Sequence, residues 1–309
     1  HSVTLYVDSV QVFNSTTDKV LPDENRMING FTDYEELTRT RRLIMRSYKL
    51  PGNRLRLLHT NESRGAVTID EERDYHFRYV LEDNFGNRRT YQFIVKGKRQ
   101  DIPEYKPEAN EMLYWNRANV IQKPGMELVV PRYYVYEDVP LRTDMRGDSS
   151  LIAFDYILDA GRTPIHSYCD LSIGLRHMPV ADTTKYYIVQ KAGKWRSSMG
   201  GKYANGWIKT RVRSLGTFSV DVDTIAPQIT PIGQGGWRTS RNIRFRIKDM
   251  ESGIGSYKVY IDGKFVLFGL KKGILVIQDP EKVKKGVPHK LEVTVTDQCG
   301  NMARKEYKF

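Results

Sequence analysis

The side chains that most often act as nucleophiles are few in this 309-residue sequence, and they are poorly placed for catalysis. Only two cysteines are present, Cys169 and Cys299. His166 lies three residues before Cys169, and residues three apart on a strand point to opposite faces, so this imidazole cannot activate this thiol directly. The sequence also lacks a Gly-x-Ser-x-Gly nucleophile motif. It therefore predicts no catalytic residue, and both cysteines are expected to be small buried hydrophobic residues.

Ligands for a metal ion are similarly sparse. Nothing near either cysteine has the spacing of a zinc site, and no two of the six histidines lie two residues apart. Two acidic turns, one with Asp249 and Glu251 and one with Asp297 and Asn301, could converge on a calcium ion. Calcium takes about six to eight oxygen ligands and these turns supply about four, so solvated turns are the alternative. We therefore predict no cofactor and assign no metal ligand in this chain.

The chain is basic, with 49 Lys and Arg against 37 Asp and Glu and a formal net charge of +12. Arg244, Arg246 and Lys248 alternate along one predicted strand, so they share one face. This charge is the electrostatic footprint of a protein with a polyanionic partner. Nucleic acid fits less well, because the basic residues are spread over the whole chain without a recognition helix or an aromatic RNA-binding motif.

Aromatic residues in the middle of the chain suggest a second kind of binding. Exposed Trp and Tyr rings can stack on sugar rings, because each offers a flat apolar face and a polar group. Trp195 and Tyr203 are the candidates for lining a glycan groove. Trp207, which lies between Gly206 and a predicted strand, is expected in the core instead.

Alternation of apolar and polar residues with a period of two dominates the sequence and predicts an all-β protein. The predicted strands include residues 3–7, 77–81, 91–95, 186–189, 218–222, 243–247, 257–261 and 291–295. One helix is predicted over about 33–47, where Thr32 to Glu35 has the pattern of a capping box. A shorter helical turn is predicted at 279–283, because Pro280 stands at its first position.

Two breaks in this pattern divide the chain. Residues 99–111 contain two prolines and four acids and read as a linker, and residues 223–227 end one block and open another. We expect β-sandwich modules at 1–98, 112–222 and 226–309, the first with the helix inserted. The first and last modules share an Asp-x-x-Gly-Asn hairpin turn, at 83–87 and 297–301, which is a repeat of architecture.

Several motifs resemble known bacterial proteins. Residues 223–227, 249–254, 257–264 and 295–301 resemble a bacterial immunoglobulin-like module. The whole chain is similar to the non-catalytic C-terminal region of large lysostaphin-type zinc metallopeptidases from Bacteroidetes. The segments that carry this resemblance are 6–10, 27–35, 200–203, 206–207 and 215–218.

The resemblance implies an accessory role. It places a peptidoglycan-cleaving peptidase domain upstream, in the periplasm or on the surface of a Gram-negative bacterium, and zinc is expected only in that domain. This chain would position the peptidase or dock it onto peptidoglycan, envelope polyanions or envelope proteins. The alternative is an autonomous surface or periplasmic binding module for a glycan or a protein partner.

The first residues favour a polypeptide that continues upstream. The sequence starts at His1 without an initiator Met or an export signal and enters a strand pattern at once, so we expect preceding sequence, including strands of the first module. Three Asp-Ser/Thr dipeptides also resemble Bacteroidetes O-glycosylation sites, with Ser9, Thr183 and Thr224 as acceptors. No apolar run approaches the roughly 18 residues of a membrane-spanning helix.

Overall fold

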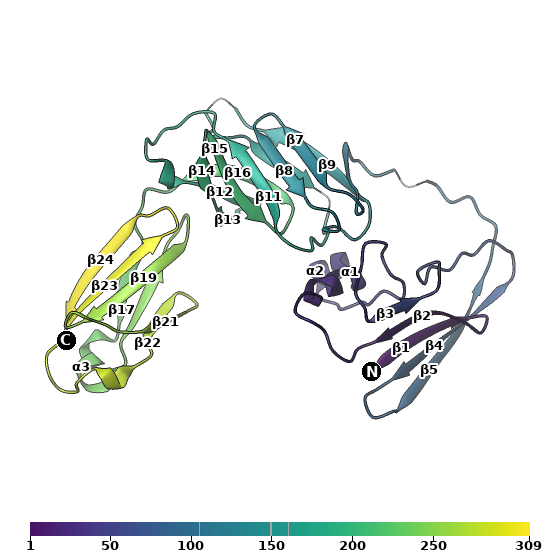
Figure 1. The fold of residues 1–309 in the computed structure, drawn as a ribbon, viewed down its shortest axis with the longest axis horizontal. Coiled ribbons are helices and arrows are strands. Elements are labelled where there is room, and N and C mark those ends of the chain that lie inside the picture. Colours follow the sequence, from purple (N-terminus) through teal and green to yellow (C-terminus); the bar gives the residue numbers. More distant parts are fainter. Residues whose placement is uncertain (105, 149, 160) are drawn as a thin grey trace.

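The computed structural model describes residues 1–104, 106–148, 150–159 and 161–309. Figure 1 shows three β-rich units in series, arranged as an arch with the middle unit at its top. The sheets are antiparallel and the described helices are short, so the all-β class is confirmed. Among the described residues, none of the helices is long and apolar enough to cross a membrane.

The first unit has one five-stranded sheet within the described residues 1–104, in the order β3-β2-β1-β4-β5. Its strands are β1 (Ser2–Val7), β2 (Val10–Thr16), β3 (Leu58–Thr60), β4 (Asp74–Glu82) and β5 (Arg88–Lys96). Phe31, Leu55 and Leu57 come from helix and loop and pack on the buried side chains of β1 and β2. The second layer of this unit is therefore made of helices and loops, where the sequence predicted a second sheet.

The helical part of the first unit is shorter than the predicted 33–47. It consists of α1 (Ile28–Phe31) and α2 (Tyr34–Thr40), and Asp33, one residue later than predicted, caps α2 by accepting from the Glu36 amide. Arg41 adopts a left-handed conformation with φ of 67° and ends the helix. The helix cannot continue because the backbone of 44–46 pairs with 31–33, where Met45 forms a bridge with Thr32.

The middle unit is a two-sheet sandwich. One sheet has the order β13-β12-β16-β10-β9-β6 and the other has the order β14-β15-β11-β8-β7. Inward side chains of both sheets form one core that includes Leu128, Tyr156, Ile188 and Phe218. The strands are β6 (Glu111–Leu113), β7 (Asn119–Lys123), β8 (Met126–Val130), β9 (Val139–Arg146), β10 (Asp155–Asp159), β11 (Cys169–Gly174), β12 (Tyr186–Ala192), β13 (Trp195–Gly200), β14 (Lys202–Ala204), β15 (Trp207–Val212) and β16 (Gly216–Val222).

The last unit is also a sandwich, with sheets in the orders β17-β18-β22-β21 and β20-β19-β23-β24. Its core surrounds Trp237, a fully buried residue of α3 (Trp237–Ser240), a helix that the sequence did not predict. The predicted turn at 279–283 is a 3-10 helix over Pro280–Lys282. The strands are β17 (Gln228–Ile232), β18 (Arg244–Lys248), β19 (Ile254–Ile261), β20 (Lys264–Phe265), β21 (Phe268–Lys271), β22 (Ile274–Ile277), β23 (Lys290–Asp297) and β24 (Met302–Lys308).

Candidate functional site

The two thiols are inert in their surroundings. Cys169 lies on β11 with 1% of its surface exposed, and burial raises the pKa of its thiol to about 12. Burial likewise raises the pKa of the Cys299 thiol to about 11. Thiolates are the reactive form, so both cysteines behave as buried hydrophobic residues at neutral pH. The His166 ring bonds elsewhere, with its Nδ1 3.1 Å from the Tyr136 hydroxyl.

His166 and Asp170 are four positions apart, which is the spacing of the His-x-x-x-Asp pair of ligands in lysostaphin-type zinc sites. His166 lies in a loop against Tyr136, while Asp170 lies on β11 beside Val129 and Arg211. Among the described residues, neither His166 nor Asp170 belongs to a cluster of three or more side chains that could hold a metal ion. The half motif therefore does not assemble a zinc site here.

The two predicted glycan-binding residues do not come together. Trp195 starts β13 and is 81% exposed, whereas Tyr203 lies on β14 of the opposite sheet and packs partly against the core. β13 extends roughly 17 Å from Trp195 to Gly200 at about 3.3 Å per residue. Trp195 and Tyr203 therefore do not form the predicted groove, although Trp195 remains an exposed ring. Trp207 is half-buried at the start of β15.

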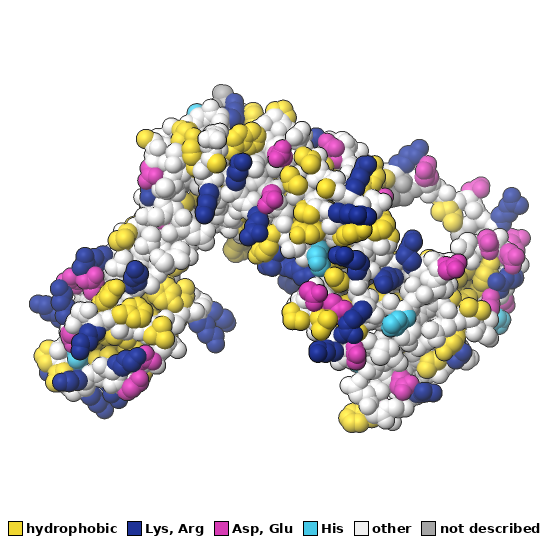
Figure 2. Space-filling model, in the orientation of Figure 1, with side chains coloured by type: hydrophobic (Ala, Val, Ile, Leu, Met, Phe, Trp, Pro, Cys, Tyr) yellow, Lys and Arg dark blue, Asp and Glu magenta, His cyan; other side chains and the backbone are white. Residues whose placement is uncertain are grey.

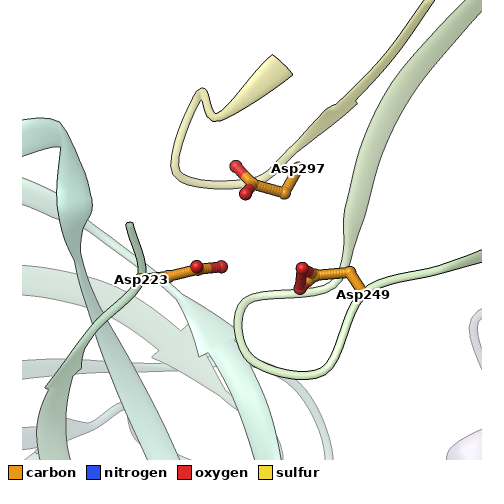
Figure 3. Close-up of side chains that lie close together, drawn as sticks. All are labelled: Asp223, Asp249 and Asp297. Atoms are coloured by element: carbon orange, nitrogen blue, oxygen red, sulfur yellow. The ribbon is translucent and has the colours of Figure 1, made fainter. Parts of the chain in front are cut away.

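Three carboxylates do converge, where the middle unit meets the last one. Figure 3 shows the side chains of Asp223, Asp249 and Asp297 pointing toward one another from separate segments. One carboxylate oxygen from each lies within 4.8 Å of the others, and Asp223 and Asp297 are buried. The sequence offered a meeting of the turns of Asp249 and Asp297 as one alternative to separate solvated turns. It did not place Asp223 with them, although the sequence marked residues 223–227 as a boundary between two units.

The chemistry of this acidic cluster is that of hard oxygen donors, which suit calcium better than zinc. Each carboxylate already accepts local hydrogen bonds. Asp249 accepts from the amides of Glu251 and Gly253, and Asp297 accepts from the amides of Cys299 and Asn301. Three carboxylates also fall short of the oxygens that calcium takes. Among the described residues these groups act as turn caps that also join two units.

Asp223 is the central residue of the junction between the middle and last units. Its Oδ2 accepts from the Ser252 amide at 3.0 Å and the Ser252 hydroxyl at 2.5 Å, and its Oδ1 accepts from the Ile225 amide at 2.9 Å. The Asn301 side chain donates to its carbonyl at 3.0 Å. The last strand of the middle unit thereby holds two turns of the last unit.

Further contacts close the same junction. Lys185 donates to the Cys299 carbonyl at 3.0 Å, and the Tyr187 hydroxyl donates to Glu251 at 3.2 Å. The Cys299 side chain packs with Tyr187 and Val189 in a small buried cluster. Burial and the nearby carboxylates raise the pKa of Tyr187 far above its ordinary value, so it stays a hydrogen-bond donor at all ordinary pH values.

The junction between the first and middle units depends on Tyr136. Its ring is 3% exposed and its hydroxyl donates to the Arg26 carbonyl at 2.8 Å, while its own carbonyl accepts from the Gly52 amide at 2.7 Å. Burial raises the pKa of the Tyr136 hydroxyl well above its ordinary value. Burial, helped by Arg54, lowers the pKa of His166 beside it, so this imidazole is neutral at pH 7. The contact is therefore uncharged, and we call the buried Tyr136 side chain the plug of this junction.

Two glycines make room for this plug. A Cβ built on Gly30 would lie 2.8 Å from the Tyr136 ring, and one built on Gly52 would lie 2.9 Å from the Tyr136 carbonyl oxygen. Real Cβ atoms do not approach so closely, so any larger residue would push Tyr136 out. Residues 99–111 thus connect two units that are already in direct contact.

Comparison with known proteins identifies a relative for the middle unit. Residues 110–223 match the family model of the Zu5-like domain, and this range coincides with the middle sandwich. No curated protein matches the chain. The middle unit is therefore similar to Zu5-like domains, and the match covers less than half of the chain.

Two solved structures align with nearly the whole chain. One is a Ca2+-stabilised adhesin with which an Antarctic bacterium binds ice; it is 10% identical, with 99% of this chain and 88% of that chain covered and a TM-score of 0.20. The other is a 1.5-MDa bacterial ice-binding adhesin, also 10% identical, with coverages of 99% and 84% and a TM-score of 0.18. TM-scores this low do not establish a shared arrangement of the units, so function must be argued from the chain itself.

Proposed function

We propose that this chain is a non-catalytic binding module of a bacterial cell envelope, in which three β units are held in one fixed arrangement. The observation that carries the proposal is that both junctions are closed by a buried side chain, Tyr136 in one and Asp223 in the other. A chain of independent domains would need neither, because flexible linkers leave unit surfaces solvated. Fixed junctions hold the outward surfaces and loops of three units at set distances, which is what presentation of a ligand or a partner requires.

The alternative accessory role, beside an upstream peptidase, stays a prediction that rests on the resemblance of the sequence. The same fixed arm would set the distance between a peptidase domain and the cell wall. The intact mass and the N-terminal sequence of the native protein test this role. A native protein with a zinc-binding domain before His1 supports it, and one that starts near His1 removes it.

The fixed arrangement can be tested by distances between spin labels. We expect narrow distance distributions between labels introduced at Thr90 and Lys209, and between labels at Lys209 and Lys264, which are exposed on the three units. Replacement Tyr136→Ala should broaden the first distribution and leave the second unchanged, because it empties the plug of one junction only. Tyr168→Ala, at a half-exposed tyrosine of the same unit, is the matched control and should change neither.

Two outcomes would contradict the proposal. Broad distributions in the unsubstituted chain would show independent units. An unchanged first distribution in Tyr136→Ala would show that the plug does not fix the junction. A second variant separates misfolding from loss of the junction: Gly30→Ala displaces Tyr136 without touching the core of the middle unit, and Gly235→Ala, where a Cβ meets nothing within 4 Å, is its control.

A further inference from the structure

One sheet of the last unit has an unusually charged outer face. The residues of β18 alternate strictly, with Phe245 and Ile247 buried and Arg244, Arg246 and Lys248 exposed. The register of the sheet carries this face across its neighbours, since cross-strand partners lie on the same side. Arg246 pairs with Ile274 of β22, and Ile274 pairs with Lys271 of β21. Lys272 follows in the exposed turn between β21 and β22.

We call these five residues the basic face: Arg244, Arg246, Lys248, Lys271 and Lys272. The other outward positions of the sheet are uncharged, namely Gln228, Thr230, Ile232, Gly269, Ile274 and Val276. Within the part of the last unit that the structure describes, none of the five cations forms an ion pair. Figure 2 shows Lys and Arg side chains projecting from this unit, including the end of the β21–β22 hairpin.

The opposite sheet of the same unit carries acidic residues on its outer side that pair with part of its cations. On its outer side Arg304 pairs with Glu292 and Glu306, and Lys290 pairs with Glu306 at 3.0 Å. Two sheets of one sandwich thus share a core but differ in surface charge. Net charge alone does not explain this difference. A face that gathers like charges without counter-charges is under self-repulsion, which an anionic ligand relieves.

The geometry of the basic face narrows the class of anionic ligand that it can bind. Alternate residues of a strand are about 6.7 Å apart and neighbouring strands are about 4.8 Å apart, so the four cations on strands are regularly spaced, with Lys272 beside them in the turn. Half-buried Ile274 and Val276 lie between them and offer apolar contact for a ring. The face has no aromatic side chain for stacking bases and no helix for a DNA groove, which disfavours nucleic acid.

We infer that the basic face binds a linear anionic polysaccharide, which lies along the sheet with its carboxylate or sulfate groups against the five cations. This inference rests on the proposed function as a binding module and names its ligand class. The fixed junctions then set how far from that polymer the other two units stand.

The test is direct binding of the full chain to two anionic polysaccharides, alginate and dextran sulfate, with neutral dextran and a poly(dT) oligonucleotide for comparison. We expect binding to alginate, to dextran sulfate or to both, no binding to dextran, and weaker binding to poly(dT). Affinity should fall as salt rises. The triple variant R244Q/R246Q/K248Q should lose at least about tenfold in affinity and show a salt slope lower by about three, since each removed cation contributes about one.

A second triple variant, K258Q/K290Q/K308Q, is the matched control, because it removes the same charge from exposed outward positions of the opposite sheet. It should retain affinity within about threefold. Three results would overturn the inference: no binding to either anionic polysaccharide, tighter binding of poly(dT), or equal losses in the two triple variants. If any of these results is obtained while the spin-label distance distributions stay narrow, the proposed fixed arrangement of the three units still holds. The two proposals can therefore fail separately.

Discussion

The hairpin turns of the first and last units have the same sequence pattern and the same hydrogen bonds, but opposite electrostatics. Asp83 accepts from the amides of Phe85 and Asn87 and from the Asn87 side chain. Asp297 accepts from the equivalent groups of Cys299 and Asn301, at 2.7–2.8 Å. Gly86 and Gly300 supply the same left-handed backbone, with φ of 83° and 79°.

The difference lies in what covers each turn. The third residue of the pattern is Phe85 in the first unit, 91% exposed, and Cys299 in the last, 2% exposed beneath the middle unit. The hydrogen bond from Asn87 holds the pKa of Asp83 below its ordinary value, whereas burial, reinforced by Asp223, raises the pKa of Asp297 above it. A local motif therefore determines the turn, and the neighbouring unit determines its energetics.

The largest loss of stability should come from replacing Asp223, the residue of the middle unit that lies against the turn of Asp297. Asp223→Ala leaves the amides of Ser252 and Ile225 and the Ser252 hydroxyl without their acceptor in a buried site. We expect the free energy of unfolding to fall by about 3 kcal/mol, measured by chemical denaturation. The control is Asp144→Ala on β9 of the same unit, an exposed residue whose carboxylate accepts from the Met145 amide and from Arg146, and this substitution should cost less. Equal losses would show that the junction adds no stability.

Exchanging the third residue of the two turns should give the next largest effect. Cys299→Phe forces a large ring between Tyr187 and Val189, and overpacking of this kind costs about 2 kcal/mol. Phe85→Cys, the reverse exchange at an exposed tip, should stay within about 0.5 kcal/mol. Thermal and chemical unfolding of both variants measure the contrast. Similar stabilities would mean that the junction opens readily around Cys299.

The smallest effect is a difference in pH dependence. The raised pKa of Asp297 means that the folded state binds the Asp297 proton more tightly than the unfolded state does. The stability that protonated Asp297 contributes to the fold is therefore lost as pH rises from the ordinary pKa of 3.8 through the pKa in the folded state. The lowered pKa of Asp83 has the opposite sign, and its contribution is lost as pH falls below 3.8. The cost of Asp297→Asn should therefore be greater near pH 4 than near pH 7.

The same experiment on the first turn should show the reverse. The cost of Asp83→Asn should be greater near pH 7 than near pH 4. Denaturation curves of both variants and the unsubstituted chain, at the two pH values, give the comparison. If the costs of the two substitutions change with pH in the same direction, the middle unit does not desolvate Asp297.

The sequence by itself determined the β class, the eight strands named from their alternation, and two of the turns between strands. Period-two alternation is a local signal, so β4, β18 and β23 could be placed from it, and Asp-x-x-Gly-Asn fixed two hairpins because its hydrogen bonds are all within five residues. The alternation of β18 also placed three cations on one face. Helix length was harder, because a long-range pairing of Met45 with Thr32 ended α2.

Only the tertiary structure decided the junctions and the sites. Tyr136 is far from Gly30 and Gly52 in the sequence and no local pattern links them, so their fit depends on how two units pack. Asp223 meets Asp249 and Asp297 for the same reason, while Trp195 and Tyr203, close in sequence, separate onto opposite sheets. Periodicity reports which face of a strand is buried, but contacts between distant segments depend on shape and desolvation, which no local pattern encodes.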